Sequence, residues 1–191
     1  MSFDESRLEG GSLTVADATL VLETLKGDKT AFSGLYDRYA RLVRAICNDT
    51  TRDLGQAQDL GQEVFLRAYS KLDKLNDPDR FGAWLVSITR NVCREYRRGK
   101  FRDRHVLVGL APDEDEQATE KDSPDERLLD LKEALNKLSE KERLALHVYY
   151  LQEQDAEQAQ KILNISRSGL YRLLAKAREK IERHLTQSDK T

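Results

Sequence analysis

Apolar residues recur at intervals of three and four along the first hundred residues, the spacing that places them on one face of an α-helix. The first long stripe follows Asp28, a candidate N-cap, and runs from Phe32 to Ile46. Two further stripes follow, and the last of them ends near Arg98. Together with a shorter leading helix, the pattern predicts a compact helical domain over residues 18–98.

A second helical block starts near residue 127. Ser139 is followed three residues later by Glu142, the spacing of a capping box that opens a helix. A short helix is predicted at residues 155–163, and another helix opens at Ser166. We therefore expect four helices in a second small domain over residues 127–186.

The two blocks are separated by residues 99–126, whose composition differs from both. Residues 90–104 carry seven Arg or Lys against two acids, whereas residues 113–126 carry eight acids and one Lys. Such a charged, apolar-poor segment is typical of a flexible linker. The predicted fold is all-α: two small helical domains joined by a flexible acidic linker, with a disordered N-terminal tail at residues 1–17 and a short C-terminal tail at residues 187–191.

Composition narrows the class of protein further. The 191 residues carry a net charge of −2 and 35% charged side chains, which suits a water-soluble, helix-rich chain. Residues 1–17 do not resemble a signal or transit peptide, and no stretch approaches the ~18 apolar residues of a membrane span. Cys47 and Cys93 lie on apolar helical faces and are expected to be buried thiols. We expect a cytoplasmic location.

The segment around residues 163–166 predicts a helix-turn-helix. Asn164 tolerates the left-handed backbone that ends a helix, and Ser166 can cap the next one. At 100° per residue, the apolar side chains from Leu170 to Ile181 share one face of that helix. The opposite face and its flanks carry Arg167, Ser168, Tyr171, Arg172, Lys176 and Arg178.

This basic face has two interpretations. A solvated helix with ordinary charge pairs is the simpler one. However, Arg172 with Lys176 and Lys176 with Lys180 are like-signed pairs at i, i+4, which destabilise an isolated helix by a few tenths of a kcal/mol. An anionic partner would relieve that repulsion, and the leading residues of such a helix can reach base edges in a major groove. The residues favour DNA binding.

A second basic surface is predicted on the last helix of the first block. Basic side chains mixed with aromatic ones can bind single-stranded bases by stacking. For Trp84, packing in the core is an equally good alternative. The residues on this surface are Trp84, Arg90, Asn91, Arg94, Arg97 and Arg98.

Four segments in this order resemble a known family, the extracytoplasmic-function (ECF) sigma factors of the sigma-70 class. The resemblance covers residues 18–186 and is carried by the order and spacing of the four motifs. They are DLGQEVFLRAYSKLDKL (59–75), RFGAWLVSITRNVCREYRR (80–98), LSEKERLALHVYY (138–150) and ISRSGLYRLLAKAREKI (165–181).

The resemblance implies a role for each block. The first would open and bind the −10 element of a promoter, with residues 76–80 capturing an unstacked base, and the second would bind the −35 element through the recognition helix. Implied −10 residues are Asn76, Asp77, Arg80, Trp84, Arg90, Asn91, Arg94, Arg97 and Arg98. Implied polymerase-docking residues are Asp59, Gln62 and Glu63, although a solvated acidic face is the simpler alternative.

The implied partners are promoter DNA, core RNA polymerase through its β′ clamp helices and β flap, and an anti-sigma factor. The sequence departs from the family at four positions of the second block. Gln160 and Asn164 replace a small residue and a Gly, and Tyr171 and Leu173 replace basic residues. These departures put the usual −35 preference in question.

Other classes of function receive little support. The chain has no Gly-rich phosphate loop, its three histidines are scattered, and no carboxylates have metal-ligand spacing. We therefore predict no catalytic residues, no cofactor and no metal. The main alternative is a sigma-like interaction module, or a helix-turn-helix regulator, that does not itself support initiation.

Overall fold

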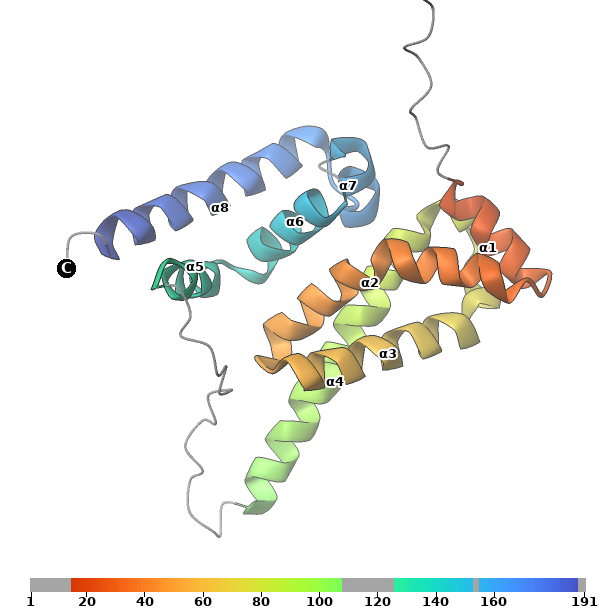
Figure 1. Cartoon of the computed structure of the whole chain (residues 1–191), viewed down its shortest axis with the longest axis horizontal. Coiled ribbons are helices and arrows are strands. Elements are labelled where there is room, and N and C mark those ends of the chain that lie inside the picture. Colours follow the sequence, from red (N-terminus) through yellow and green to blue (C-terminus); the bar gives the residue numbers. More distant parts are fainter. Residues whose placement is uncertain (1–14, 108–125, 153–154, 189–191) are drawn as a thin grey trace, which may run out of the picture.

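A computed structural model describes residues 15–107, 126–152 and 155–188. Within these ranges every regular element is a helix, which agrees with the predicted all-α fold. Both predicted tails lie largely outside the described residues, and so does the acidic segment from residue 108 to 125. The chain forms two groups of helices that lie against each other (Figure 1).

The first group contains four α-helices and two short 3₁₀ turns, and two of its helices, α2 and α3, begin at capping aspartates. Asp28 accepts a hydrogen bond from the Thr30 N–H at 2.8 Å, and Asp53 accepts one from the Gln56 N–H at 2.7 Å. The elements are α1 (Asp17–Leu25), α2 (Lys29–Thr51), α3 (Leu54–Ser70), the 3₁₀ turns Leu72–Lys74 and Pro78–Arg80, and α4 (Phe81–Leu107).

The end of α4 differs from the sequence prediction. The first domain was expected to end at Arg98 and the linker to begin at Gly99, but the helix continues to Leu107. A Gly inside a helix costs only about 1 kcal/mol, and the Lys and Arg residues that follow Gly99 are good helix formers. The last turns of α4 therefore extend beyond the other three helices (Figure 1).

The second group contains α5 (Glu126–Asn136), α6 (Glu140–Leu151), α7 (Ala156–Leu163) and α8 (Arg167–Ser188). The predicted capping box is present: the Ser139 N–H donates to Glu142 at 2.8 Å, and the Glu142 N–H donates to the Ser139 hydroxyl at 3.4 Å. Asp155 caps α7 through the N–H groups of Glu157 and Gln158. All four predicted helices of this block are confirmed.

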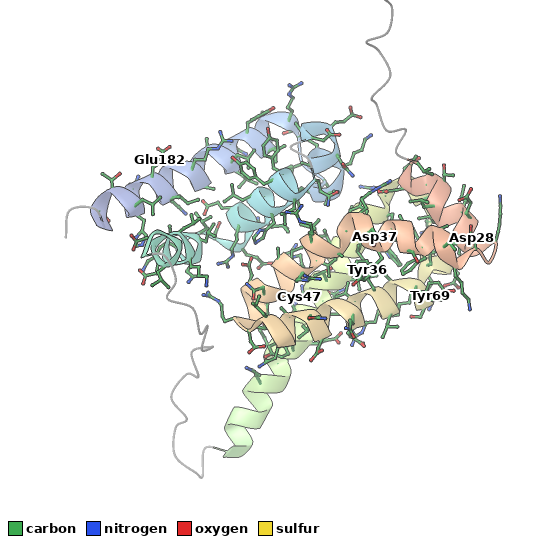
Figure 2. The ribbon with its side chains drawn as sticks, in the orientation of Figure 1. Asp28, Tyr36, Asp37, Cys47, Tyr69 and Glu182 are labelled. Carbon is green, nitrogen blue, oxygen red and sulfur yellow. The ribbon has the colours of Figure 1, made fainter. Side chains whose placement is uncertain are left out.

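The buried thiols connect helices of the first group. Cys47 on α2 is labelled in Figure 2, and both it and Cys93 on α4 are buried and unoxidised. A hydrogen bond between the two thiols lowers the pKa of Cys93 and raises that of Cys47. The Cys93 Sγ also lies 3.9 Å from the Ile46 carbonyl oxygen. The prediction of buried thiols is confirmed.

The two groups share one hydrophobic core. Buried side chains of α2 and α4, among them Tyr39 and Phe81, form a continuous cluster with buried side chains of α6, α7 and α8. Figure 1 shows α6 and α7 on the side of the second group that faces α2 and α4. The sequence predicted two domains on a tether, and the structure adds that they pack directly on each other.

Candidate nucleic-acid interface

The helix-turn-helix forms where the sequence predicted it. Asn164 adopts the left-handed conformation, with φ of 52°, and ends α7. The Gly169 N–H donates to the Ser166 hydroxyl at 3.2 Å, so Ser166 caps the start of α8. Because Asn tolerates this backbone better than most residues, the turn forms without the Gly that the family usually has.

The two faces of α8 separate as helical geometry requires. Leu170, Leu174 and Ala177 are buried, while Leu173 and Ile181 are partly buried against the same core. The predicted DNA-facing side chains are exposed on the other side. These exposed residues are Arg167, Ser168, Tyr171, Arg172, Lys176 and Arg178.

The cationic side chains on the exposed face of α8 differ in the partners that they contact. The Arg167 guanidinium lies over the Tyr171 ring, 5.8 Å from its centroid, and Arg178 donates to the Tyr150 hydroxyl at 2.9 Å. That hydrogen bond raises the pKa of Arg178. Among the described residues, neither Arg172 nor Lys176 has an acidic partner. The leading half of α8 therefore presents cations that no carboxylate neutralises.

Lys180, also part of the basic run, has a structural role instead. Its ammonium donates to both carboxylate oxygens of Glu142 on α6, at 2.9 and 2.8 Å. This contact is the main reason that the pKa of Glu142 falls to about 2. Since Glu142 also completes the capping box, the ion pair ties α8 to the start of α6, and it neutralises the charge of Lys180.

The departures from the family pattern fit the local structure. Gln160 is partly buried and donates its side-chain amide to the Ala156 carbonyl at 2.8 Å, so its polar end is satisfied within α7. Tyr171 is 44% exposed, on the side of α8 away from the core. Leu173 packs toward the core. Of the four departures, Tyr171 is the one that changes the chemistry of the DNA-facing surface.

The second basic surface lies along α4. Arg90, Asn91, Arg94, Arg97 and Arg98 are all exposed, as predicted. Sequence reasoning missed that α3 contributes to the same surface. A pocket between α3 and α4 is lined by Arg67, Lys71, Ile88, Asn91, Arg94, Glu95 and Arg98. The basic residues near the end of α3 were the available signal, but only packing shows that they face α4.

The loop before α4 is held by its own side chains. Asp77 accepts a hydrogen bond from the Asp79 N–H at 3.1 Å and starts the 3₁₀ turn, and Asn76 remains exposed. Trp84 is partly buried and packs on Phe81, with ring centroids 6.0 Å apart. Trp84 therefore packs against the core and is only partly buried, and its role in binding a base stays a prediction. Arg80 donates to Asn164 of the other group at 3.0 Å.

The predicted docking residues lie on the outer face of α3. Asp59 and Gln62 are exposed, and Glu63 is partly exposed. Arg67 contacts Glu63 at 2.5 Å and Glu95 of α4 at 2.6 Å, and these two bonds raise its pKa, with the Glu95 bond contributing more. Leu66, which lies about one turn after Gln62, is 66% exposed and was missed in the sequence. Acidic and apolar groups together make this face a candidate protein-docking surface.

The described residues contain no cluster of three or more His, Cys, Asp or Glu side chains that could hold a metal ion. None of the helices in the described part of the chain is long and apolar enough to cross a membrane.

Comparison with known families gives two matches in chain order. The family model described as Sigma-70 region 2 matches residues 35–102, from α2 into the last turns of α4. The model described as Sigma-70, region 4 matches residues 128–181, which covers α5 to most of α8. One match falls within each of the two groups of helices.

Two curated relatives extend the similarity over most of the chain. A probable RNA polymerase sigma factor RfaY of Xanthomonas campestris pv. campestris is 30% identical over 179 residues, 82% of this chain but 42% of that protein. The ECF RNA polymerase sigma factor SigW of Bacillus subtilis is 24% identical over 176 residues, 86% of this chain and 94% of that protein. The chain thus spans less than half of the first relative and nearly all of the second.

A solved structure supports the fold. The chain resembles CnrH, whose structure was determined in complex with the cytosolic domain of CnrY, with a TM-score of 0.62 and 23% sequence identity. The match covers 91% of this chain and 99% of that one.

Proposed function

The chain belongs to the sigma-70 family of RNA polymerase sigma factors, the proteins of transcription initiation, and from this premise we propose that its two groups of helices bind a promoter at two separate elements. The observation that carries the proposal is the pair of exposed basic surfaces, one on α8 and one on α4. Each surface belongs to a different helical group. A bipartite DNA site follows from that arrangement.

We assign −35 recognition to α8. Its leading residues are exposed on a helix-turn-helix, and a recognition helix of this kind places its N-terminal side chains against base edges in the major groove. Arg172 is suited to a bidentate contact with a guanine, because its guanidinium carries paired donors and has no acidic neighbour. Arg178, further along the helix, is suited to a phosphate.

We assign −10 binding and strand opening to α4 and the loop before it. The exposed cations of α4, with Lys71 just after the end of α3, suit the phosphates of a DNA strand. Trp84 offers an aromatic surface for an unstacked base, and Asn76 and Asp77 offer hydrogen-bonding groups in the loop before α4. This assignment follows the family resemblance and the exposure of these side chains.

The proposed protein partners follow from the same premise. Asp59, Gln62, Glu63 and Leu66 form the surface that we assign to the β′ clamp helices of core RNA polymerase, and the second group of helices would meet the β flap. An anti-sigma factor is a further proposed partner. The role is one of binding rather than catalysis, with no cofactor, and it would be carried out in the cytoplasm.

In vitro transcription tests the proposal. Purified protein is added to core RNA polymerase and a library of promoter fragments, without any added nucleotide cofactor beyond the transcription substrates. We expect transcripts with defined start sites, absent with core enzyme alone. The Arg172→Ala variant serves as the matched control, and it should give fewer of these transcripts while still binding core enzyme.

The alternative has a different outcome. A sigma-like interaction module would bind core enzyme but yield no specific transcript from any fragment. A conventional helix-turn-helix regulator would bind promoter DNA without core enzyme and would not form a stable complex with it. Either result would contradict the proposed function.

A further inference from the structure

The two cysteines lie in contact inside the first group of helices, and the proposed function uses neither of them. Cys47 of α2 is fully buried, and Cys93 of α4 is 2% exposed. A hydrogen bond joins their thiols across the two helices. Two sulfur atoms in contact are close enough to form a bond after small adjustments of their side chains. The fold therefore brings together two thiols that are far apart in the sequence.

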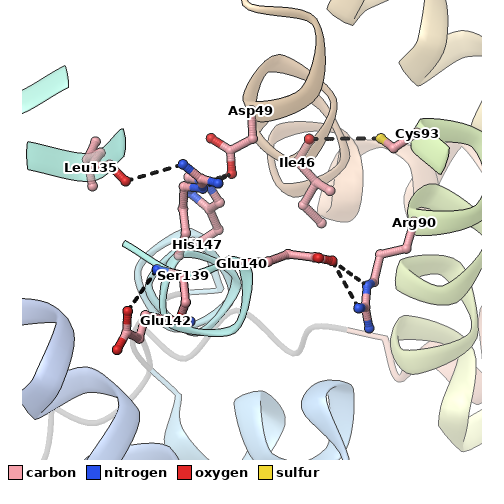
Figure 3. A network of polar contacts seen from close by, with 10 residues as sticks. Ile46, Asp49, Arg90, Cys93, Leu135, Ser139, Glu140, Glu142 and His147 are labelled. Carbon is pink, nitrogen blue, oxygen red and sulfur yellow. Dashed lines mark hydrogen bonds and ion pairs between the residues drawn. The ribbon is translucent and has the colours of Figure 1, made fainter. Parts of the chain in front are cut away.

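Cys93 differs from Cys47 because its side chain lines a pocket of about 70 Å³ (Figure 3). A water molecule requires only about 10–15 Å³, so a molecule of the size of hydrogen peroxide has room beside the Cys93 sulfur. Charged side chains from three helices also line this pocket. They are Asp49 of α2, Arg90 and Arg97 of α4, and Glu140, Arg143 and His147 of α6.

Most of the charges around this pocket are already paired with each other. Asp49 lies 3.0 Å from both Arg143 and His147, and Arg90 lies 2.9 Å from a carboxylate at the start of α6. Within the described ranges of the chain, Arg97 makes no ion pair with a carboxylate. Its positive charge is therefore available to stabilise a thiolate at the pocket.

The surroundings of Cys93 favour the thiolate form of its side chain. The hydrogen bond from Cys47 is the main reason that the pKa of Cys93 falls to about 7. The Thr50 hydroxyl and the charge of Arg97 act in the same direction, whereas burial and the Asp49 carboxylate oppose them. The shared hydrogen bond raises the pKa of Cys47. Since the thiolate is the nucleophilic form of cysteine, the Cys93 sulfur is the one that reacts first.

We propose that Cys93 and Cys47 form a reversible redox site: a small peroxide that enters the pocket oxidises Cys93, and Cys47 then forms a disulfide with it. A thiol that lines a cation-bearing pocket, with a second thiol in contact behind it, is the arrangement of a peroxide-sensitive cysteine and its resolving partner. The inference goes beyond the proposed function and does not depend on it.

The chemistry has two steps. In the first, the Cys93 thiolate attacks one oxygen of the peroxide, the O–O bond breaks, and Cys93 becomes a sulfenic acid. With hydrogen peroxide, the leaving hydroxide takes up a proton and becomes water. In the second step, the Cys47 sulfur attacks the Cys93 sulfur, so the S–S bond forms and the S–O bond breaks. The departing hydroxide takes the Cys47 proton. Two thiols are thus oxidised to a disulfide while the peroxide is reduced to two water molecules.

The first step prepares Cys47 for the second. The negative charge of the Cys93 thiolate contributes to the raised pKa of Cys47, and a neutral sulfenic acid no longer exerts it. The disulfide joins α2 to α4. Thiol reductants reverse such a bond by exchange, so in a reducing compartment it would form transiently under oxidising conditions.

Treatment of the purified full-length chain with hydrogen peroxide at pH 7 tests the proposal. Free thiols are counted after quenching, and peptide mass spectrometry locates the modified residues. We expect the folded chain to lose both free thiols and to form an intramolecular disulfide between Cys47 and Cys93. Dithiothreitol should restore both thiols. This measurement requires no substitution, so it does not depend on whether a variant folds.

The order of the two steps is tested with cysteine variants, and circular dichroism checks that each remains helical. Cys47→Ser should stop at a sulfenic acid on Cys93, which dimedone traps. Cys93→Ser should leave the Cys47 thiol unreacted. Thr50→Val removes the hydroxyl that favours the thiolate and should slow the loss of thiols several-fold. Thr186→Val, which removes an exposed hydroxyl from α8, is the matched control and should react like wild type.

Several results would overturn the proposal. Thiols that stay reduced in the folded chain but react after unfolding in urea would show that burial protects both. Disulfides that form only between two chains would show that the pair does not react within the fold. A sulfenic acid on Cys47 in Cys93→Ser, or an unchanged rate in Thr50→Val, would contradict the assignment of the reactive thiolate to Cys93.

Discussion

Asn164 combines two tasks in one residue. Its backbone takes the left-handed conformation, with φ of 52°, that turns α7 into α8, and its side-chain oxygen accepts the hydrogen bond from Arg80. A Gly at this position would allow the same turn but would offer no acceptor. The departure from the family's usual Gly therefore adds a contact between the two groups of helices, at a smaller backbone penalty than most other residues would incur.

Substitutions at Arg172 and Arg178 can distinguish a contact to a base from general electrostatic attraction to DNA. Arg172→Ala should lower the binding free energy for the preferred −35 site by about 1–3 kcal/mol and relax the preference at one base pair. Arg178→Ala should instead weaken binding to all sequences alike. It should also reduce the slope of the logarithm of the binding constant against the logarithm of salt concentration by about one. Competition binding with a set of single-base variants of the site measures both effects.

Arg183→Ala is the matched control. Arg183 is exposed on the same helix, pairs with Glu179, and lies about 16 Å further from the leading turn than Arg172. Its loss should leave sequence preference unchanged. Equal, sequence-independent losses for Arg172→Ala and Arg178→Ala would show that Arg172 contacts only phosphate.

Glu142 should make stability depend on acid pH. Its pKa in the folded protein is lowered to about 2 from an ordinary value of 4.5, mainly by the hydrogen bonds from Lys180. Because the pKa of Glu142 is lower in the folded than in the unfolded protein, its carboxylate contributes fully to stability above about pH 4.5. This contribution disappears as the pH falls through about 2. Glu142→Gln should lower the free energy of unfolding by about 1.5–3 kcal/mol at pH 7.

Urea unfolding at pH 7, 4 and 2 measures this dependence. The difference in unfolding free energy between wild type and Glu142→Gln should become small as the pH approaches 2. Glu179→Gln removes an exposed ion pair from α8 and should change stability by less than about 1 kcal/mol at each pH. A gap that stays constant with pH would mean that the Glu142 carboxylate is not what stabilises the contact.

Among the elements, α3 provides the clearest test of docking. Asp59→Lys reverses a charge on its outer face, which should weaken binding to core RNA polymerase at least tenfold through lost attraction and added repulsion. Asp59 is exposed and makes no ion pair among the described residues, so the unfolding free energy should shift by less than about 0.5 kcal/mol. Fluorescence titration with labelled core enzyme gives the affinity.

Glu63 is less suitable for the same test. Its carboxylate holds Arg67, which also bonds Glu95 of α4, so Glu63→Lys would disturb the packing of α3 on α4. Glu23→Lys reverses an exposed charge on α1 and serves as the control. If both Asp59→Lys and Glu23→Lys bind core enzyme like wild type, the docking surface lies elsewhere.

For the whole molecule, two glycines of α4 test how tightly the helices pack. A Cβ at Gly82 would lie 2.7 Å from the Tyr39 hydroxyl of α2 and 2.9 Å from Ile162 of α7, whereas a Cβ at Gly99 meets nothing within 4 Å. Gly82→Ala should lower the free energy of unfolding by about 1–3 kcal/mol. Gly99→Ala should raise it by up to about 1 kcal/mol, because Ala is the better helix former.

Equilibrium urea unfolding of the full chain, followed by circular dichroism, gives both values. The two substitutions add the same methyl group to the same helix, so they differ only in surroundings. Equal effects at the two positions would contradict the close packing of α4 against α2 and α7.

Local sequence determined the helices and their faces. Asp28, Ser139, Asp155 and Asn164 start or end helices where predicted, because caps and turns depend on groups only a few residues apart. The burial of Leu170 and the exposure of Arg172 follow in the same way from the helical period. These features were predictable because the chain's own geometry fixes them.

Partners distant in the sequence were decided only by tertiary structure. Arg80 and Asn164 are 84 residues apart, and Arg90 and Glu140 are 50 apart, so no local pattern pairs them. The pairing of Lys180 with Glu142 has the same origin, since the two residues are 38 positions apart and lie on different helices. Periodicity gives the face of a helix on which a side chain lies, but which other helix packs on that face depends on how the whole core is filled.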